Sequence, residues 1–291
     1  MRALVAKIAV ALVVLLVVAA AGSWFVGSQI VHGAASEVPR AMEPAQDITL
    51  KTRDGIKIAG TYWPGRTPNA PAVLLLHGLG ASRSQTAANA EWLASIGYAA
   101  LTIDLRGHGE STITDHTYGL DEGLDARAAF DWLKAKQEGA KVGVIGISLG
   151  GAAALVGRDG PVPADALVLE AVFPTIRAAI YNRLRVRTSF VGATLFEPLL
   201  SFQALPRYGV WPSRISPLSA LRTFRAPVLV IGGEADRYTT PAETRRLYKA
   251  APAARGLWIV PGLDHGRTSS LGDVEWRKRV GAFFAGTIGT P

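Results

Sequence analysis

The chain has 291 residues, of which 49% are hydrophobic, with a formal net charge of +8 and no cysteine. This length and composition allow one large folded core, and the sequence contains no internal repeat or low-complexity run that would indicate a repeat array or a disordered tail. The lack of cysteine excludes disulfides, a thiol nucleophile and a thiolate metal site.

The N-terminal segment differs from the rest of the chain. Arg2 and Lys7 precede an uncharged and mainly apolar stretch, Ile8–Val31, which is long enough to span a bilayer. Trp24 and Phe25 lie where an interfacial aromatic anchor is expected. Basic residues at the amino end favour a cytoplasmic N-terminus with the rest of the chain on the other side of the membrane. We therefore predict a single-pass membrane anchor over the first 31 residues.

A cleaved signal peptide is the alternative for this segment. Small residues at 19–21 and at 33–35 could be accepted by a signal peptidase, and Ile8–Ala21 has the length of a signal h-region. Cleavage would make the protein secreted. A buried globular helix is disfavoured because nothing polar interrupts the apolar run to form an outer face.

The folded domain is expected over residues 47–291, after a linker at 32–46 that contains Pro and Ala. Asp47–Thr52 and Ile56–Trp63 alternate in polarity around a turn with Gly55, which predicts a β-hairpin. The domain therefore opens with antiparallel strands.

From Pro71 onward, short apolar runs alternate with helix-like segments. Such runs are typical of strands buried on both faces, and the alternation predicts right-handed crossovers and a parallel sheet covered by helices. A dinucleotide-binding fold shares this alternation, but Gly78 and Gly80 are followed by Arg83 where that fold needs a third glycine. The strands are expected at Val73–Leu76, Ala99–Ile103, Val142–Ile147, Ala166–Leu169, Val228–Ile231 and Leu257–Val260, and the helices at Arg83–Ile96, Asp121–Gln137, Ala242–Lys249 and Asp273–Phe284.

A Gly-x-Ser-x-Gly pentapeptide with Ser148 at its centre follows the predicted strand Val142–Ile147 and leads into a stretch of small residues. This setting predicts a nucleophile elbow. The strained turn requires small residues two positions before and after the serine, and these are Gly146 and Gly150. A chance pentapeptide in a glycine-rich chain is the alternative.

A serine hydroxyl needs a base within hydrogen-bond reach and an acid that orients the base. In open parallel sheets such groups collect at the carboxyl ends of strands, where Asp236 and His265 follow the last two predicted strands. The order Ser148, Asp236, His265 is the α/β-hydrolase order and differs from both protease orders. The alternative acids are Glu170, Glu234 and Asp264.

With these residues the chain, from about residue 47, resembles the α/β-hydrolase superfamily, and within it the lidded esterase, lipase and Bem46-like or serine-aminopeptidase-like branch. Leu76–Gly80 matches the oxyanion loop of that branch, and Asp104–Ser111 matches its loop after the fourth strand. The resemblance implies a mostly parallel eight-stranded sheet flanked by helices, with an inserted lid. It assigns the oxyanion hole to the backbone N–H groups of Leu79 and Leu149, and the supporting loops to His77, Gly78, Gly146 and Gly150.

Residues 172–225 interrupt the alternation and are interpreted as the lid. They contain eight arginines against one acidic residue, Glu197. Because the positive charge is concentrated here, the high pI does not indicate a nucleic-acid-binding surface. Arg183, Arg185 and Arg187 lie among aromatic residues, a mixture that suits a phospholipid surface or an anionic acyl substrate. The alternative is a solvated lid exterior with aromatic side chains packed beneath it.

The remaining histidines are assigned no catalytic role. His77 and His108 are expected to shape loops by bonding backbone groups, and His32 and His116 are expected to be solvated. No cluster of histidines and carboxylates at ligand spacing remains, so neither a metal nor another cofactor is expected.

The resemblance implies a serine hydrolase that cleaves carboxylic esters, including lipid or lysophospholipid esters, through an acyl-enzyme. Ser148 would attack the carbonyl, His265 would take and return the proton, and Asp236 would orient the imidazole. A peptidase, a thioesterase or an acyltransferase with the same triad is an alternative, as is a non-catalytic anchored binding module. The sequence specifies neither the acyl-chain length nor the oligomeric state.

Overall fold

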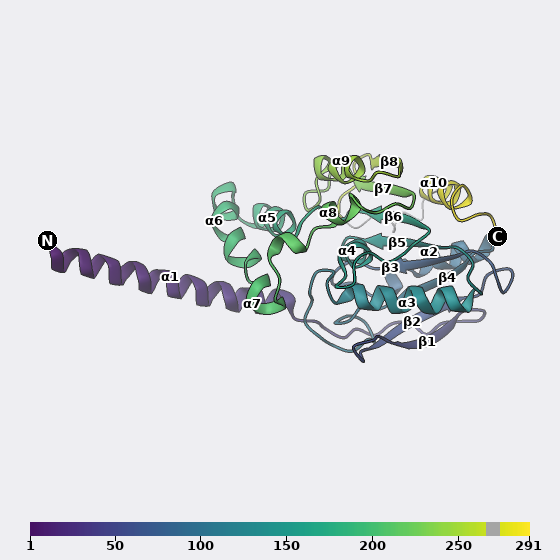
Figure 1. Cartoon of the computed structure of the whole chain (residues 1–291), viewed down its shortest axis with the longest axis horizontal. Helices are drawn as coiled ribbons and strands as arrows, with labels where there is room; N and C mark the ends of the chain where they lie inside the picture. Colours follow the sequence, from purple (N-terminus) through teal and green to yellow (C-terminus); the bar gives the residue numbers. More distant parts are fainter. Residues whose placement is uncertain (266–273) are drawn as a thin grey trace.

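A computed structural model of the chain describes residues 1–265 and 274–291, and one eight-stranded sheet lies at its centre (Figure 1). The strands are β1 (Gln46–Lys51), β2 (Lys57–Trp63), β3 (Ala72–Leu76), β4 (Ala99–Ile103), β5 (Val142–Ile147), β6 (Ala166–Glu170), β7 (Val228–Gly233) and β8 (Ala254–Val260). Their order is β1-β2-β4-β3-β5-β6-β7-β8. β2 pairs antiparallel with β1 and β4, and the other neighbours are parallel. The predicted α/β-hydrolase fold with an antiparallel opening is confirmed.

The central strands are buried because helices cover both faces of the sheet. These helices are α2 (Ser84–Ser95), α3 (Glu122–Lys136), α4 (Leu149–Val156), α8 (Pro217–Leu221), α9 (Pro241–Ala250) and α10 (Val274–Ala285). Side chains of α2 and α10 fill the core on one face, and those of α3, α4, α8 and α9 fill it on the other. Every residue of β3, β4, β5 and β6 is buried, which explains their unbroken apolar runs.

Most predicted elements lie close to the observed ones. The predictions Ala99–Ile103 and Val142–Ile147 coincide with β4 and β5. β8 begins at Ala254, before the predicted apolar run, because it is an edge strand that tolerates exposed residues such as Arg255. The predicted start of the last helix, Asp273, lies outside the described residues.

The chain changes its direction of travel across the sheet at β3. It passes from β3 to β4 on one side, and after β4 it returns to β5 on the other side of β3. Loops that diverge in this way leave a crevice beyond the carboxyl ends of the strands. The loop after β3 and the turn after β5 therefore border the same crevice.

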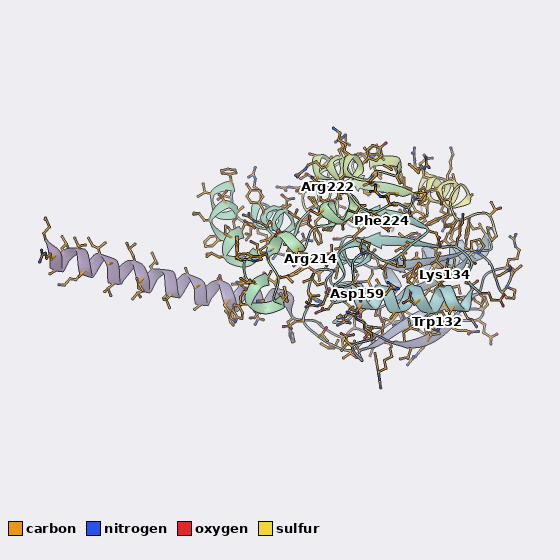
Figure 2. The ribbon with its side chains drawn as sticks, in the orientation of Figure 1. Trp132, Lys134, Asp159, Arg214, Arg222 and Phe224 are labelled. Atoms are coloured by element: carbon orange, nitrogen blue, oxygen red, sulfur yellow. The ribbon has the colours of Figure 1, made fainter. Side chains whose placement is uncertain are left out.

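The segment predicted as a lid is helical and lies between β6 and β7. Its helices before α8 are α5 (Ile176–Arg187), α6 (Phe190–Ser201), α7 (Ala204–Tyr208) and the short 3-10 helix η1 (Pro212–Arg214). Thr175 and Ser189 cap α5 and α6 with their side-chain oxygens. Arg214 ties the segment to the domain because it donates hydrogen bonds to the carbonyl oxygens of Val156 and Gly157, at 2.9 and 3.0 Å (Figure 2).

Aromatic residues of this segment are divided between the interior and the surface. Phe173 is buried, whereas Phe190, Phe196 and Trp211 are 60, 50 and 58% exposed. The alternative in which the aromatic side chains pack beneath a solvated lid therefore does not describe these three.

The N-terminal helix α1 (Arg2–Val31) projects away from the domain, and its carboxyl-terminal end lies against α6 and α7 (Figure 1). In the described part of the chain, it is the helix that is long and apolar enough to cross a membrane, by length and composition. Leu4, Leu12, Leu15 and Val18 are exposed on it. A membrane anchor and a signal sequence both fit this finding.

Candidate active site

Ser148 occupies the sharp turn between β5 and α4. Its backbone has φ 48° and ψ −105°, which is an uncommon conformation for a residue with a side chain. A Cβ on Gly146 would lie 2.5 Å from Gly151 Cα, and one on Gly150 would lie 2.4 Å from the carbonyl oxygen of Leu76. Both glycines are therefore needed for the turn that presents Ser148.

The structure brings Ser148, His265 and Asp236 together from the loops after β5, β8 and β7. Ser148 Oγ lies 3.4 Å from His265 Nε2, and His265 Nδ1 lies 2.8 Å from Asp236 Oδ2. With its Nδ1 proton donated to the carboxylate, the neutral ring directs its Nε2 acceptor toward the serine hydroxyl. Asp236 is buried, and its Oδ1 accepts from the backbone N–H groups of Tyr238 and Thr239 at 2.8 Å each. Three hydrogen bonds thus fix the carboxylate that orients the ring.

The three alternative acids have other surroundings. Glu170 is buried at the end of β6 and accepts a hydrogen bond from Trp276 Nε1 at 2.7 Å. Glu234 is exposed and accepts from the backbone N–H of Gly262 at 3.0 Å. Asp264 is exposed. The geometry therefore favours Asp236 as the partner of the histidine ring.

Leu79 and Leu149 line the same cavity as Ser148. Leu149 is the first residue of α4, so its N–H has no acceptor within the helix, and the amino end of a helix favours negative charge. Within the described residues, neither the Leu79 nor the Leu149 N–H is used in a hydrogen bond. Both donors are therefore available to a bound group.

His77 is buried at the end of β3 and connects two loops of the site. Its Nε2 accepts from the backbone N–H of Leu105 at 3.0 Å, and its Nδ1 donates to the carbonyl oxygen of Gly78 at 2.7 Å. A second proton on this ring would have to bind Nε2, where it would face the N–H group of Leu105 and remove the acceptor of that hydrogen bond. Burial is the main reason why the pKa of His77 is lowered to about 3.

His108 supports the residue on the other side of Leu79. Its Nε2 accepts from the backbone N–H of Gly80 at 3.1 Å, and its Nδ1 donates to the carbonyl oxygen of Arg106 at 3.0 Å. Burial also lowers the pKa of this ring. The two histidine rings therefore position the loop that carries the Leu79 N–H.

The expectation that His116 is solvated is wrong. The ring is 5% exposed and stacks on His108 with centroids 4.2 Å apart. Its backbone is held from two sides, because its N–H donates to the carbonyl oxygen of Val31 and its own carbonyl accepts from the Tyr208 hydroxyl. Its sequence neighbours are polar, so only the packing of distant segments reveals its burial. His32 is exposed, as expected.

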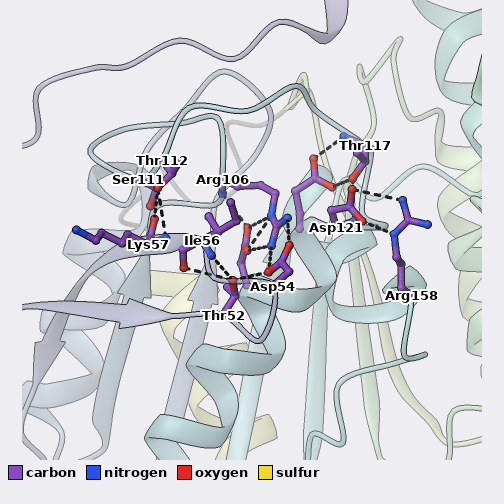
Figure 3. A network of polar contacts seen from close by, with 12 residues as sticks. Thr52, Asp54, Ile56, Lys57, Arg106, Ser111, Thr112, Thr117, Asp121 and Arg158 are labelled. Atoms are coloured by element: carbon purple, nitrogen blue, oxygen red, sulfur yellow. Dashed lines mark hydrogen bonds and ion pairs between the residues drawn. The ribbon is translucent and has the colours of Figure 1, made fainter. Parts of the chain in front are cut away.

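An arginine holds the loop after β4 in place, as Figure 3 shows. Arg106 forms ion pairs of 2.7 Å with Asp54 and with Asp125, and its backbone N–H donates to Asp125 at 2.8 Å. The hydrogen bond from Arg106 lowers the pKa of Asp54 to about 2. The sequence motif Asp104–Ser111 includes this arginine, but both partners lie outside the motif, and no sequence signal links them to it.

A cavity of about 230 Å³ lies beside Ser148, between the lid helices, the end of α1 and the loops after β3 and β5. Its lining is mainly apolar. Arg183, Arg187 and Arg207 also line it, and among the described residues no acidic side chain does. The cavity therefore suits an amphiphile with an apolar chain and a negative charge.

Arg183 is the arginine of this cavity that lies near the triad. It donates to the carbonyl oxygen of Ala179 at 3.2 Å, and its guanidinium carbon lies 5.5 Å from the centroid of the Tyr238 ring. The same ring packs edge-on against His265, at 5.4 Å between centroids. A positive charge thus lies one aromatic ring away from the histidine.

Two parts of the cavity wall are not predicted from the sequence. Tyr118 contributes from the loop after β4, and Gly27, Ile30 and Val31 contribute from α1. The sequence contains no signal for the residues of α1, because the apolar character of this segment is already explained by a membrane span or a signal peptide.

Comparisons with known proteins identify the family. Residues 73–273 match the alpha/beta hydrolase family. The uncharacterized protein Rv2307c of Mycobacterium tuberculosis is 30% identical over 79% of this chain and 77% of its own length. The lysophosphatidylserine lipase ABHD12 of Macaca fascicularis is 38% identical over 57% of this chain, but this match spans only 41% of that protein.

Among solved structures, the Pyrococcus furiosus esterase Pf2001 superposes with a TM-score of 0.68 at 22% identity, over 88% of this chain and all of the esterase. The esterase of Thermogutta terrifontis superposes with a TM-score of 0.56 at 18% identity, over 81% of this chain and 97% of that one. At these identities the likeness concerns the fold.

Proposed function

The chain belongs to the alpha/beta hydrolase family, and from this premise we propose that it is a membrane-anchored serine hydrolase that cleaves carboxylic esters of single-chain lipids. The observation that carries the proposal is the hydrogen-bonded series Ser148, His265 and Asp236 at the carboxyl edge of the sheet. A neutral imidazole held by a buried carboxylate can accept the proton of a serine hydroxyl.

In the proposed mechanism, Ser148 Oγ attacks the ester carbonyl while His265 Nε2 takes its proton. The N–H groups of Leu79 and Leu149 stabilise the oxyanion, and each such donor can supply about 3–4 kcal/mol. His265 then protonates the departing alcohol. Water, deprotonated by the same ring, attacks the acyl-enzyme and releases the acid.

The proposed substrate is a lipid ester with one acyl chain and an anionic head group. The apolar lining accommodates the chain, and the three arginines of the cavity attract the negative charge. The similarity to ABHD12, a lysophosphatidylserine lipase, supports a substrate of this class.

The membrane attachment is proposed from α1. Its apolar length suits a single span, and Arg2 and Lys7 at its amino end favour a cytoplasmic N-terminus with the catalytic domain outside. Exposed apolar residues and arginines of the lid would then face the membrane surface.

The test uses the full chain in detergent micelles. We expect a fluorophosphonate to label the wild type and Ser148→Ala to abolish both labelling and the hydrolysis of a p-nitrophenyl ester series from acetate to palmitate. Ser95→Ala is the matched control, because Ser95 is an exposed serine on α2, and it should behave as the wild type. Equal ester hydrolysis by the wild type and Ser148→Ala would overturn the proposal.

Other outcomes of the same test identify the alternatives. Labelled protein that cleaves aminoacyl amides or thioesters faster than esters would be a peptidase or a thioesterase. Acyl transfer to an added alcohol in preference to water would indicate an acyltransferase. Folded wild type that is not labelled would be a non-catalytic binding module.

A further inference from the structure

We propose that the last turns of α1, Ser23–Val31, form a fixed wall of the cavity and limit the acyl-chain length that it accepts, so that these turns remain in the mature protein. The inference rests on the proposed function in one respect, namely that the cavity holds an acyl chain. In this proposal α1 selects substrates by chain length, in addition to its proposed role as the membrane anchor.

Polar contacts lock these turns to the lid. Gln203 Nε2 donates to the carbonyl oxygen of Ser23 at 2.9 Å. Arg207 donates to the carbonyl oxygen of Trp24 at 2.9 Å and to Ser28 Oγ at 2.8 Å. Its guanidinium carbon also lies 3.9 Å from the centroid of the Trp24 ring. A helix that only crossed a bilayer would need none of these contacts.

At Gly27, α1 packs closely against Gln203 of the lid. Gly27 is buried, and a Cβ at this position would lie 2.1 Å from Gln203 Oε1. Gly22 lies on the same helix, but a Cβ there would have no neighbouring atom of the described residues within 4 Å, so a side chain meets open space. Gly27, Ile30 and Val31 line the cavity that contains Ser148, whereas Gly22 does not.

The chain is also held immediately after the helix. The carbonyl oxygen of Val31 accepts from the backbone N–H of His116 at 2.7 Å. The backbone N–H of Ala34 donates to the carbonyl oxygen of Gly107 at 3.0 Å. The end of α1 is therefore fixed to the lid on one side and to the loop after β4 on the other.

The surface around this wall points to a lipid leaflet as the source of the acyl chain. α6 lies against α1, and its residues Phe190, Val191, Leu195 and Phe196 are at least half exposed. They continue the apolar surface of a helix that is long enough to span a bilayer. Because the cavity is lined by both α1 and the lid, we expect a lipid of the leaflet around α1 to enter it directly.

The experiment compares Gly27→Leu with Gly22→Leu in the full chain, reconstituted in phosphatidylcholine nanodiscs. Hydrolysis of p-nitrophenyl butyrate and palmitate gives the chain-length preference, and labelling by a small fluorophosphonate counts competent sites. We expect Gly27→Leu to keep labelling and butyrate hydrolysis but to lose about tenfold or more in kcat/KM for palmitate. Gly22→Leu should match the wild type.

A second variant tests the wall in the opposite direction, because it makes a side chain of the wall smaller and so introduces no steric clash. Ile30→Ala enlarges the cavity, and with the p-nitrophenyl ester series from acetate to palmitate we expect it to move the optimum toward longer chains. An unchanged palmitate rate in Gly27→Leu, equal losses in Gly27→Leu and Gly22→Leu, or an unmoved optimum in Ile30→Ala would overturn the proposal. So would a mature protein whose intact mass shows cleavage after Ala35, because that chain lacks the wall.

Failure of the proposed function is recognised separately. If the wild type hydrolyses no ester, the wall is tested by thermal stabilisation with palmitic acid alone. Stabilisation of the wild type and Gly22→Leu, but not of Gly27→Leu, would support the wall without an esterase. Equal stabilisation of all three proteins, or of none, would overturn it.

Discussion

The rings of His77 and His108 pack edge to face with centroids 4.9 Å apart, and each bonds the backbone of a residue next to Leu79. The N–H group proposed for the oxyanion hole is therefore positioned from both sides by neutral imidazoles. Catalysis should depend on these rings even though neither takes part in proton transfer.

His108→Phe removes the acceptor for the Gly80 N–H and keeps an aromatic ring in place. We expect kcat to fall about tenfold per competent site, since a donor that is displaced from the oxyanion contributes less to the transition state. Site titration with a fluorophosphonate separates this effect from loss of folded protein. His32→Phe, at an exposed position, should leave kcat unchanged. Equal kcat values for both variants would refute the positioning role.

Asp236→Asn preserves the shape of the side chain but removes the charge that orients His265. We expect kcat to fall by about 10³–10⁴-fold because the imidazole then favours the wrong tautomer. Glu234→Gln and Asp264→Asn test two of the alternative acids, and each should remain within about threefold of the wild type, because both side chains are exposed and Asp236 is the carboxylate bonded to His265 Nδ1. A larger loss of kcat in either of these variants than in Asp236→Asn would show that the other acid, and not Asp236, orients His265.

Arg183→Gln should change the preference for charged substrates. With lysophosphatidylserine we expect KM to rise about tenfold, whereas with monoacylglycerol of the same chain length it should stay the same, because only the first carries an anion for the arginine. Arg185→Gln, on the same helix but over the Phe190 ring, is the matched control. Equal KM changes for the two substrates would show that Arg183 does not bind the anionic head group.

Arg106→Met should unfold the domain more easily. It leaves Asp125, whose side chain is 0% exposed, without its ion-pair partner, and loss of one member of a buried pair costs about 3–5 kcal/mol. Arg127→Met removes an exposed pair with Asp131 and should cost less than about 1 kcal/mol. Thermal unfolding in detergent measures both. Similar melting temperatures for the two variants would contradict the structural role of the network.

Stability should fall as the pH falls from 6.5 to 4. In the folded protein burial lowers the pKa of His77 to about 3 and that of His116 to about 4, from an ordinary value of 6.5. Over this range the unfolded chain binds protons that the folded chain does not, so each histidine lowers the free energy of unfolding by at most about 1.4 kcal/mol per pH unit. Burial raises the pKa of Asp125 to about 7, so this one group acts in the opposite direction, and the two histidines together outweigh it.

A variant tests this assignment. His116→Phe removes one of the titrating groups, and in the described structure His116 Nδ1 has no hydrogen bond to lose. The slope of melting temperature against pH should become shallower by the contribution of one proton. A slope identical to that of the wild type would show that His116 does not titrate on unfolding.

The sequence by itself determined the features that depend on local chain geometry. The strand at Val142–Ile147 is recognisable because a strand buried on both faces has to be apolar throughout. Gly146 and Gly150 are recognisable because the turn at Ser148 leaves no space for a Cβ at either position. The candidates Asp236 and His265 follow from the rule that loops at the carboxyl ends of parallel strands meet.

Only the tertiary structure decided which distant groups share a buried environment. His116 has polar neighbours in sequence, yet its ring is buried and stacks on His108, and its backbone bonds Val31 and Tyr208. Arg106 pairs with Asp54 and Asp125, which lie outside its own loop. Gly27 reads as part of an apolar span, and its place in the cavity wall arises from contact with Gln203, far along the chain. Hydropathy records how strongly a segment avoids water, whereas these contacts depend on which surfaces meet after the segments have folded.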